Sequence, residues 1–445
     1  MRRTAILVLA LCLSSAASAL PPEDTRHLLA RAGFGAAVAD FATFAEDDRR
    51  QAVRRLLDAR RDVAETPPPD YVGGDRSFYM TRGPADAEAQ QARQVRLYHQ
   101  GRAMKGWWLQ EMAETPSPLT ERMVLFWHNH FVTSFEKVRD PDLLVRHNMT
   151  LRRHALGNFR DMLHAVAADP GMIKYLDTIT NRRQGPNENF ARELLELFTL
   201  GEGRYSEADI KEAARAFAGW SVDEPSGRFK IVPAATDPGS KTIFGHTGPF
   251  DGGQVLDLIL QRPETAPFIV RKLWREFISD KPDEAVVAAV ARRFGRDWDI
   301  AGAVGGLLDS QAFWADGNRG RLVKSPTDLM IGAIRVLGTS GVKWEDLALQ
   351  VRQLGQDLFQ PPNVRGWPGG TAWINTDTLL LRRELLDRRT RGRELGDAAA
   401  KLAAIAGSPR AMDRLLLATA AVGPLPDEAD ERLAAILLDP AYQVK

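Results

Sequence analysis

Cysteine is almost absent from this sequence of 445 residues, which contains a single one, Cys12. Beyond the N-terminal segment, no apolar run approaches the roughly 20 uninterrupted residues of a membrane-spanning helix. Neither sign of charge dominates, since 59 Lys and Arg residues against 58 Asp and Glu leave a formal net charge of +1. These shortages argue against a disulfide scaffold, a membrane helix, and a protein that binds nucleic acid through its overall charge. With 44% hydrophobic residues, the composition is that of a globular protein.

Familiar catalytic motifs are missing as well. The sequence has no Gly-x-Ser-x-Gly elbow, no Gly-rich phosphate loop, no dinucleotide fingerprint and no His-Glu-x-x-His. The Glu-x-x-His of di-iron bundles is also absent, and its nearest equivalent is Glu193-x-x-Glu196. Hydrolases of the usual α/β kind, zincins and di-iron bundle enzymes are therefore disfavoured.

The first nineteen residues have the three parts of a secretory signal peptide. Arg2 and Arg3 precede an apolar stretch from Ile6 to Leu13, and Ala17-Ser18-Ala19 is a small-residue cleavage site. The sequence therefore predicts export to the periplasm or the exterior, with residues 1–19 removed. Cleavage there would also remove Cys12, so a thiolate metal site or a cysteine nucleophile is excluded from the mature chain.

Helical spacing of apolar residues dominates the rest of the chain. The predicted fold is mainly α, a large irregular multi-helix bundle with one small β-hairpin that pairs Arg228–Val232 with Lys241–Phe244. No βα alternation appears, which disfavours a doubly wound sheet. We expect one large helical domain over 20–445, or two lobes, 20–220 and 251–445, joined by the hairpin segment 225–250. Predicted helices include 24–32, 41–59, 88–112, 141–156, 187–200, 206–220 and 266–279.

Several segments in a characteristic order carry a family resemblance. They are Leu28–Gly35 (LLARAGFG), Glu121–Ser134 (ERMVLFWHNHFVTS), Pro186–Gly201 (PNENFARELLELFTLG), Tyr205–Trp220 (YSEADIKEAARAFAGW), Lys324-Ser325-Pro326 and Pro361–Gly370 (PPNVRGWPGG). The chain resembles the bacterial domain-of-unknown-function 1800 family over nearly its whole mature length. The resemblance implies an exported, mostly helical protein, without an activity to carry over. It also implies a partner, because relatives are often encoded beside the exported domain-of-unknown-function 1501 family.

One motif departs from this family pattern. Many relatives have a His-Asp pair ahead of the Gly-x-Lys in the hairpin turn, whereas this chain has Thr236-Asp237 there. A role for that histidine therefore does not carry over.

Two histidines, His128 and His130, form a His-x-His pattern that suits a divalent metal such as Zn, Mn or Fe. On a regular helix the two imidazoles would point about 200° apart. Joint binding of one ion therefore requires the helix that starts near Glu121 to end near Trp127. The alternative is that both histidines are hydrogen-bonded structural groups among the neighbouring aromatic rings.

Charged residues recur along the Asn187–Gly201 segment, where Glu188, Arg192 and Glu196 lie at i, i+4 and i+8. They form either a surface ion ladder or the polar wall of an interior cavity. For the second case we expect Glu188, Glu193 and Arg192 to be catalytic, with Glu196 completing a metal site formed with His128 and His130.

Two classes of function follow from these motifs. The first is a soluble, exported, metal-dependent enzyme with hydrolytic chemistry in a His/Glu pocket. The second is a non-catalytic envelope binding or assembly protein that acts with an exported partner. Its contact surface would be the hairpin or the rigid loop Pro361–Gly370, in which Trp367 and nearby Trp373 could form an aromatic platform.

Overall fold

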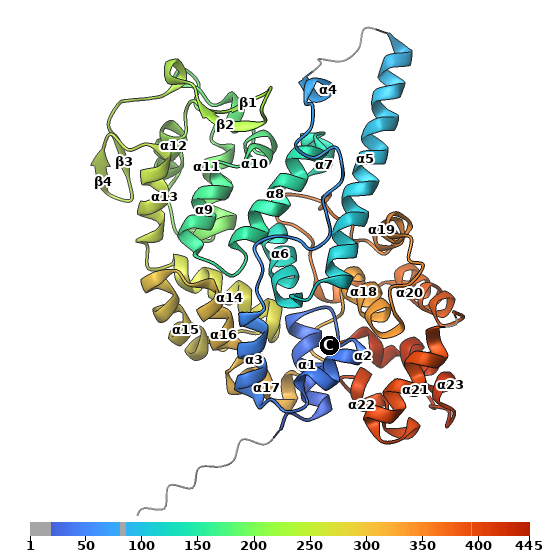
Figure 1. Ribbon diagram of the computed structural model, residues 1–445. Coiled ribbons are helices and arrows are strands. Elements are labelled where there is room, and N and C mark those ends of the chain that lie inside the picture. The colour runs from blue at the N-terminus through green and yellow to red at the C-terminus, as the bar shows by residue number, and fades with distance from the viewer. Residues whose placement is uncertain (1–18, 81–85, 393) are drawn as a thin grey trace, which may run out of the picture.

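The computed structural model describes residues 19–80, 86–392 and 394–445, and it confirms a mainly helical fold (Figure 1). Within these residues the chain forms 23 α-helices and two small antiparallel two-stranded sheets. The predicted signal peptide lies outside the described residues as far as Ser18. No helix in the described ranges combines the length and apolarity needed to cross a membrane.

The first half of the chain contains the helices that carry most of the motifs. They are α1 (Pro22–Ala32), α2 (Val38–Phe44), α3 (Arg49–Asp58), α4 (Ser77–Met80), α5 (Ala87–Glu114), α6 (Pro118–His130), α7 (Phe135–Val138), α8 (Pro141–His154), α9 (Phe159–Ala167), α10 (Pro170–Tyr175), the 3₁₀ turn η1 (Thr178–Thr180), α11 (Asn189–Glu193), the π-helical η2 (Leu194–Thr199) and α12 (Glu207–Ala216).

The second half begins with the strands and is otherwise helical. Its elements are β1 (Trp220–Asp223), β2 (Arg228–Ile231), η3 (Pro233–Ala235), β3 (Lys241–Ile243), β4 (His246–Gly248), α13 (Gly252–Leu260), α14 (Thr265–Phe277), α15 (Glu284–Asp297), α16 (Ile300–Leu308), α17 (Gln311–Trp314), η4 (Asp316–Asn318), α18 (Pro326–Leu337), α19 (Trp344–Gln353), η5 (Gly370–Trp373), α20 (Thr376–Arg389), α21 (Glu394–Ala406), η6 (Pro409–Ala411), α22 (Asp413–Leu416), α23 (Ala429–Leu438) and η7 (Pro440–Gln443).

The predicted single helix over 41–59 is two helices, α2 and α3. Asp48 lies between them and caps α3, because its side chain accepts a hydrogen bond from the Gln51 backbone N–H at 2.8 Å. The Gln51 side-chain oxygen in turn accepts a hydrogen bond from the backbone N–H of Asp48, also at 2.8 Å. This reciprocal capping box starts a new helix where apolar periodicity alone suggested continuation.

The predicted strands are present, but their pairing was wrong. Strand β2 pairs with β1, so that Trp220 faces Ile231, and β3 pairs with β4. The reason lies in the turns. A short turn ending at Gly227, whose φ is +59°, closes the first hairpin, and Phe244-Gly245, both with positive φ, closes the second. Two local hairpins therefore replace the single longer-range pair.

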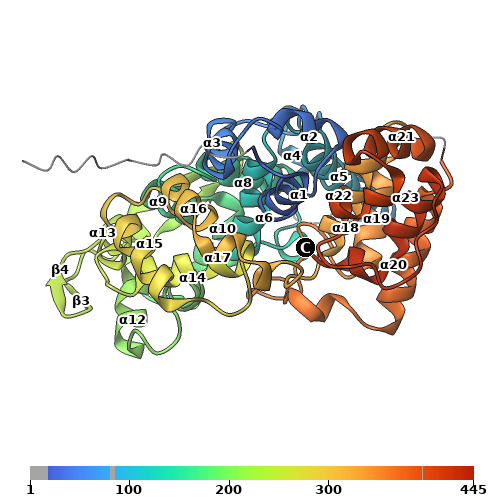
Figure 2. The same cartoon turned by 90° about the horizontal axis from the view of Figure 1, so that it is seen from below.

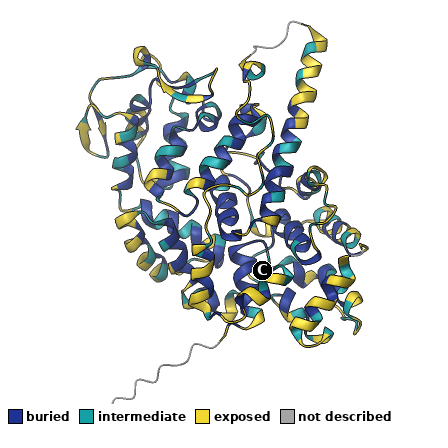
Figure 3. Cartoon of the chain, viewed as in Figure 1, coloured by how far each residue is buried: buried dark blue, intermediate teal, exposed yellow. Residues whose placement is uncertain are grey.

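One contiguous cluster of buried apolar side chains runs through the molecule from Leu20 to Tyr442. Figure 3 shows these buried residues concentrated on the inner helices. The β3–β4 hairpin and the C-terminal helices α20, α21 and α23 lie at opposite ends of the molecule (Figure 2). The core cluster draws on both predicted lobes, and the division into lobes stays a prediction.

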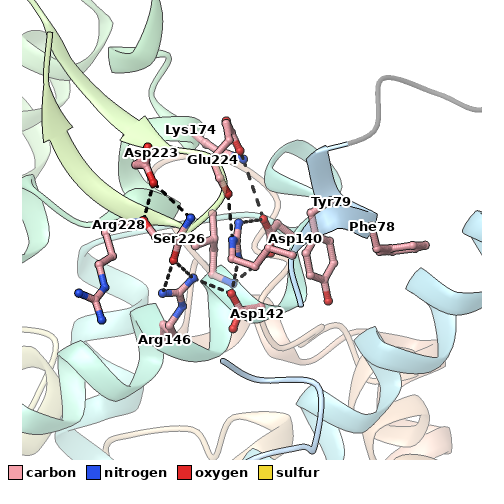
Figure 4. Close-up of polar contacts among 12 residues, drawn as sticks. Phe78, Tyr79, Asp140, Asp142, Arg146, Lys174, Asp223, Glu224, Ser226 and Arg228 are labelled. Carbon is pink, nitrogen blue, oxygen red and sulfur yellow. Dashed lines mark hydrogen bonds and ion pairs between the residues drawn. The ribbon is translucent and has the colours of Figure 1, made fainter. Parts of the chain in front are cut away.

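An ion network attaches the β1–β2 hairpin to the body (Figure 4). Buried Arg76 pairs with Asp140, at 2.7 Å, and with Asp142, both in the first turn of α8 or just before it. The Arg76 guanidinium also donates to the backbone oxygen of Glu224 in the hairpin turn, at 3.3 Å. Lys174 completes the link with a 2.8 Å ion pair to the Glu224 side chain. The loop before α4, the start of α8 and the hairpin are thus joined through one guanidinium.

A second buried network centres on Asp328, in the first turn of α18. Its carboxylate pairs with Arg122 of α6 and, at 2.9 Å, with Lys445. Arg122 also donates to the backbone oxygen of Gly33 at 2.9 Å and lies 3.3 Å from Glu276 of α14. Burial alone would raise the pKa of Asp328, but Arg122 and Lys445 outweigh it and hold that pKa well below its ordinary value. Asp328 therefore stays ionised and joins α6, α14 and α18.

Replacing Asp328 with Ala is expected to destabilise the protein by ~3–5 kcal/mol at pH 7, because it leaves the buried Lys445 without its counter-charge and leaves Arg122 with Glu276 alone. Since the folded-state pKa is depressed, the stabilisation is present above the unfolded-state pKa of about 3.9 and is lost as the pH falls below it. Urea denaturation between pH 3 and pH 7 measures both effects. The matched control is Asp316→Ala, whose side chain is 99% exposed. Equal losses in the two variants would contradict this role for Asp328.

Candidate functional site

A cleft with a volume of about 720 Å³ lies between several of these helices. It adjoins a smaller cavity of about 270 Å³, with which it shares Asn129, His130, Lys272 and Arg365. Segments that are far apart in the sequence meet here: the end of α6, the π-helical η2, α14, the Ser325 turn and the Pro361–Gly370 loop. A volume of this size suits a small-molecule ligand.

Two helices present one face each to this space. From α6 the lining residues are Arg122, Leu125, Phe126, Asn129 and His130, and from α14 they are Phe268, Lys272, Arg275 and Glu276. Both sets follow the three-to-four-residue repeat of a single helix face. The cleft is therefore built on rigid elements.

The central contact is between Lys272 and His130. The Lys272 Nζ lies 2.9 Å from His130 Nδ1 and donates to the backbone oxygen of Leu197 at 2.9 Å. The other ring nitrogen, Nε2, lies 3.0 Å from the backbone oxygen of Phe198 and must donate to it. His130 is therefore the neutral Nε2–H tautomer, with Nδ1 accepting a proton from the amine.

The two backbone oxygens are available because of where η2 ends. The last carbonyls of a helix have no partner within it, and Leu197 and Phe198 lie in the final residues of the π-helical segment. The NENFARELLELFTLG segment thus contributes carbonyl groups to the site. π-Helical turns are frequent at functional sites.

Burial lowers the pKa of Lys272 to about 7, and the positive charge of Arg275 acts in the same direction. Burial, followed by the charge of Lys272, holds the pKa of His130 well below its ordinary value. The Phe268 ring lies 4.8 Å from the Lys272 Nζ and forms part of the apolar wall. A substantial fraction of Lys272 is therefore uncharged near neutral pH.

The charged groups around the two cavities are unequally distributed. The large cleft is bordered by six cations and three carboxylates: Arg122, Lys272, Arg275, Arg321, Arg365 and Lys445 against Glu276, Asp280 and Asp328. The smaller cavity adds Glu196 and Glu202. Within the described residues, Arg275 has no ion pair and no side-chain hydrogen bond. The large cleft is therefore suited to an anionic ligand.

The condition for joint metal binding, a helix that ends near Trp127, is not met, because α6 continues to His130. His128 and His130 therefore lie on different faces of a regular helix, and only His130 borders the cavities. His128 is fully buried, 4.9 Å from the ring centroids of both Trp108 and Phe359. Burial, with His147 nearby, lowers the pKa of His128 to about 3.

These positions remove the basis for joint metal binding by the two histidines. Both nitrogens of His130 are engaged in the contacts described above. Among the described residues, no group of three or more His, Cys, Asp or Glu side chains has a metal-binding arrangement. The divalent metal itself stays a prediction.

Glu196 is the one predicted carboxylate that borders the same cavity as His130. It accepts hydrogen bonds from Tyr205, at 3.0 Å, and from Arg365, at 2.8 Å. Its carboxylate thereby ties η2 to the Pro361–Gly370 loop. The structure thus brings together His130 and Glu196, with Glu196 held by two donors.

The other predicted residues of this helix lie away from the cavities. Arg192 pairs with Glu188 at 3.3 Å, as in the surface ion ladder considered from the sequence, but its second partner is Glu207, at 2.8 Å, and not Glu196, which pairs with Arg365. Glu193 is half-buried, and burial, followed by the charge of Glu196, raises its pKa. None of Glu188, Arg192 and Glu193 borders either cavity. Their predicted catalytic role therefore has no geometric support.

The loop Pro361–Gly370 is clamped by Asn129 of α6. The Asn129 Oδ1 accepts a hydrogen bond from the backbone N–H of Trp367 at 2.7 Å. Gly366 has a φ of +82°, and a Cβ placed there would lie 2.2 Å from the Asn129 Oδ1. Trp367 is only 5% exposed and Trp373 only 7%, so both rings pack mainly as core residues at the cleft wall. The close approach of the loop to α6 thus requires glycine at 366.

The sequence motifs did not reveal Lys272. It lies in the amphipathic helix α14, where a lysine beside apolar residues is ordinary. A weak signal is the spacing of Phe268, Lys272 and Glu276, which places these residues on one face.

The fold and the cleft define a mainly helical protein with a lysine–histidine pair at the centre of a cationic cleft. The chain belongs to the family described as protein of unknown function (DUF1800), whose model matches residues 27–444. The predicted family membership is therefore confirmed. No curated protein and no solved structure matches the chain.

Replacing Gly366 with Ala is expected to displace the loop from Asn129 and to destabilise the protein by ~1–3 kcal/mol beyond the cost of positive φ. The matched control is Gly369→Ala, where φ is +69° but a Cβ would meet nothing within 4 Å. Urea denaturation followed by tryptophan fluorescence reports the stability of each variant. Equal stability of the two variants would rule out the clamp.

Proposed function

We propose that this chain is an exported enzyme that binds an anionic substrate in the large cleft and uses the amine of Lys272 as its reactive group. The observation that carries the proposal is the placement of this amine between His130 Nδ1 and the Leu197 carbonyl, at the border of both cavities. A desolvated lysine beside another cation is a recognised way of activating an amine.

The neutral amine has two protons and one lone pair. The two acceptors at 2.9 Å occupy the two protons, which leaves the lone pair in the remaining tetrahedral direction. The lone pair can then remove a proton from a substrate or attack an electrophilic carbon. His130 orients the amine and can accept its proton.

The cationic wall supports an anionic substrate. Arg275 lies one helical turn from Lys272 on α14, and Arg321 borders the cleft from the segment before α18. The carboxylates Asp328 and Glu276 are already engaged with Arg122. A carboxylate or phosphate group of a substrate would find unpaired positive charge at Arg275.

This proposal differs from the metal-dependent hydrolysis expected from the sequence. That expectation placed one ion on His128, His130 and Glu196, with Glu188, Glu193 and Arg192 as catalytic groups, whereas His130, Glu196 and Lys272 are the groups that border the smaller cavity. A purely binding role in the envelope, with a partner of the 1501 family, would give no turnover that depends on Lys272.

Replacing Lys272 with Met is expected to lower kcat/KM about 100-fold or more, the usual contribution of a positioned base or nucleophile. The assay is turnover of a panel of anionic esters, amides and carbonyl compounds by the purified mature protein. Lys401→Met, which alters an exposed lysine of α21, is the control and should keep full activity. Circular dichroism and thermal unfolding check that both variants fold.

The pH dependence of this activity has a definite sign. Because the neutral amine reacts, kcat/KM should rise with pH and level off above the Lys272 pKa of about 7. Full turnover by Lys272→Met, or a profile that is flat through neutral pH, would contradict the proposal.

Export is the second part of the proposal, and it depends on the tripartite N-terminus. Cleavage after Ala19 would make Leu20 the first residue, and Leu20 is buried in the core, with its backbone nitrogen 2.6 Å from the Asp47 oxygen. We expect mass spectrometry of the protein from the envelope fraction of its host to find Leu20 at the N-terminus. Recovery of the protein with Met1 intact in the cytoplasm would overturn this part.

A further inference from the structure

We propose that Lys272 forms a reversible imine with a carbonyl compound that carries a carboxylate, such as a 2-oxo acid. This inference rests on the proposed function and specifies it, since it names the covalent step and the substrate class. It depends on the position of one amine, the group that accepts its proton, and the charges around it.

The Lys272 amine is held in one position, as a nucleophile must be. Lys272 is anchored by His130 and by the Leu197 carbonyl, so its position is fixed by α6, η2 and α14 together. The Phe268 ring, whose centroid lies 4.8 Å from the Lys272 Nζ, lines the smaller cavity together with Leu197 and Val364, so an apolar wall adjoins the amine.

His130 supplies the proton transfers that imine formation needs. The nitrogen of Lys272 attacks the carbonyl carbon and forms the N–C bond, and His130 Nδ1 takes one amine proton and passes it to the carbonyl oxygen. The resulting carbinolamine loses its hydroxyl group with the second nitrogen proton as water, which leaves the C=N bond. One amine and one carbonyl compound thus become one imine and one water, without an oxidant or reductant.

During the proton transfer, one hydrogen bond to the backbone stabilises the imidazolium form of His130. Its Nε2–H donates to the Phe198 backbone oxygen at 3.0 Å, so the ring keeps its orientation when Nδ1 gains a proton. The low pKa of His130 means that it returns that proton readily. It is therefore a relay between the amine and the carbonyl oxygen.

The substrate class follows from the cleft wall next to the amine. Arg275 is on the same helix as Lys272, three residues away, and it has no ion pair within the described residues. A carboxylate next to the reacting carbonyl would give the Arg275 guanidinium an acceptor.

Reductive trapping tests the imine directly. The purified full mature protein is incubated with pyruvate and sodium cyanoborohydride, and tryptic peptides are analysed by mass spectrometry. We expect one reduced carboxyalkyl adduct, on the peptide that contains Lys272, and no such adduct in Lys272→Met. Lys401→Met should label like the wild type.

A neutral carbonyl compound of similar size tests the anion requirement. Acetone at the same concentration is expected to label Lys272 about tenfold less than pyruvate does, and Arg275→Gln should remove most of that difference. Labelling spread over the exposed lysines, without preference for Lys272, would overturn the inference. Equal labelling by pyruvate and acetone would overturn the assignment of a carboxylate-bearing substrate.

The outcomes separate this inference from the proposed function. If turnover depends on Lys272 but no adduct is trapped, the amine acts as a base and the imine proposal is wrong. If neither turnover nor trapping depends on Lys272, both proposals fail.

Discussion

A single buried carboxylate, Asp328, is the constraint on which the geometry of this molecule depends. It is a counter-charge for the buried side chains of Arg122 and Lys445. Arg122 in turn donates to the Gly33 backbone oxygen and pairs with Glu276 of α14. Asp328, Arg122 and Glu276 thus join α6 to α14, the two helices that carry His130 and Lys272.

The chemistry of the cleft depends on backbone carbonyl groups that have no hydrogen-bond partner within their own helix. The π-helical end of η2 provides two carbonyl oxygens, which accept from Lys272 and from His130. Because these bonds fix the imidazole tautomer, its other nitrogen can only accept, and the amine becomes its donor. Burial then favours the uncharged amine. The packing of α6, η2 and α14 around Lys272 thus produces a weakly basic lysine in a fixed position.

The sequence predicted the helical fold and the family, because both depend on local spacing and on long motifs. It was wrong about the strand pairing, which two tight turns decide, and about the break at Asp48, which a capping box causes. Within the site, it identified His130 and Glu196 but missed Lys272, since one lysine in an amphipathic helix has no distinctive pattern. It left two interpretations open for Glu188 and Arg192, a surface ion ladder and a catalytic cavity wall, and these two residues form an ion pair away from the cavities.

The central claim is that Lys272 is a weakly basic amine held by His130. Selective ¹³C labelling of lysine with an NMR titration of the ε-carbon shift tests it most directly, with Lys272→Met used to assign the signal. The structure predicts a midpoint near pH 7 for Lys272, well below the ordinary lysine value of about 10.4. A Lys272 midpoint at or above that ordinary value would contradict the account.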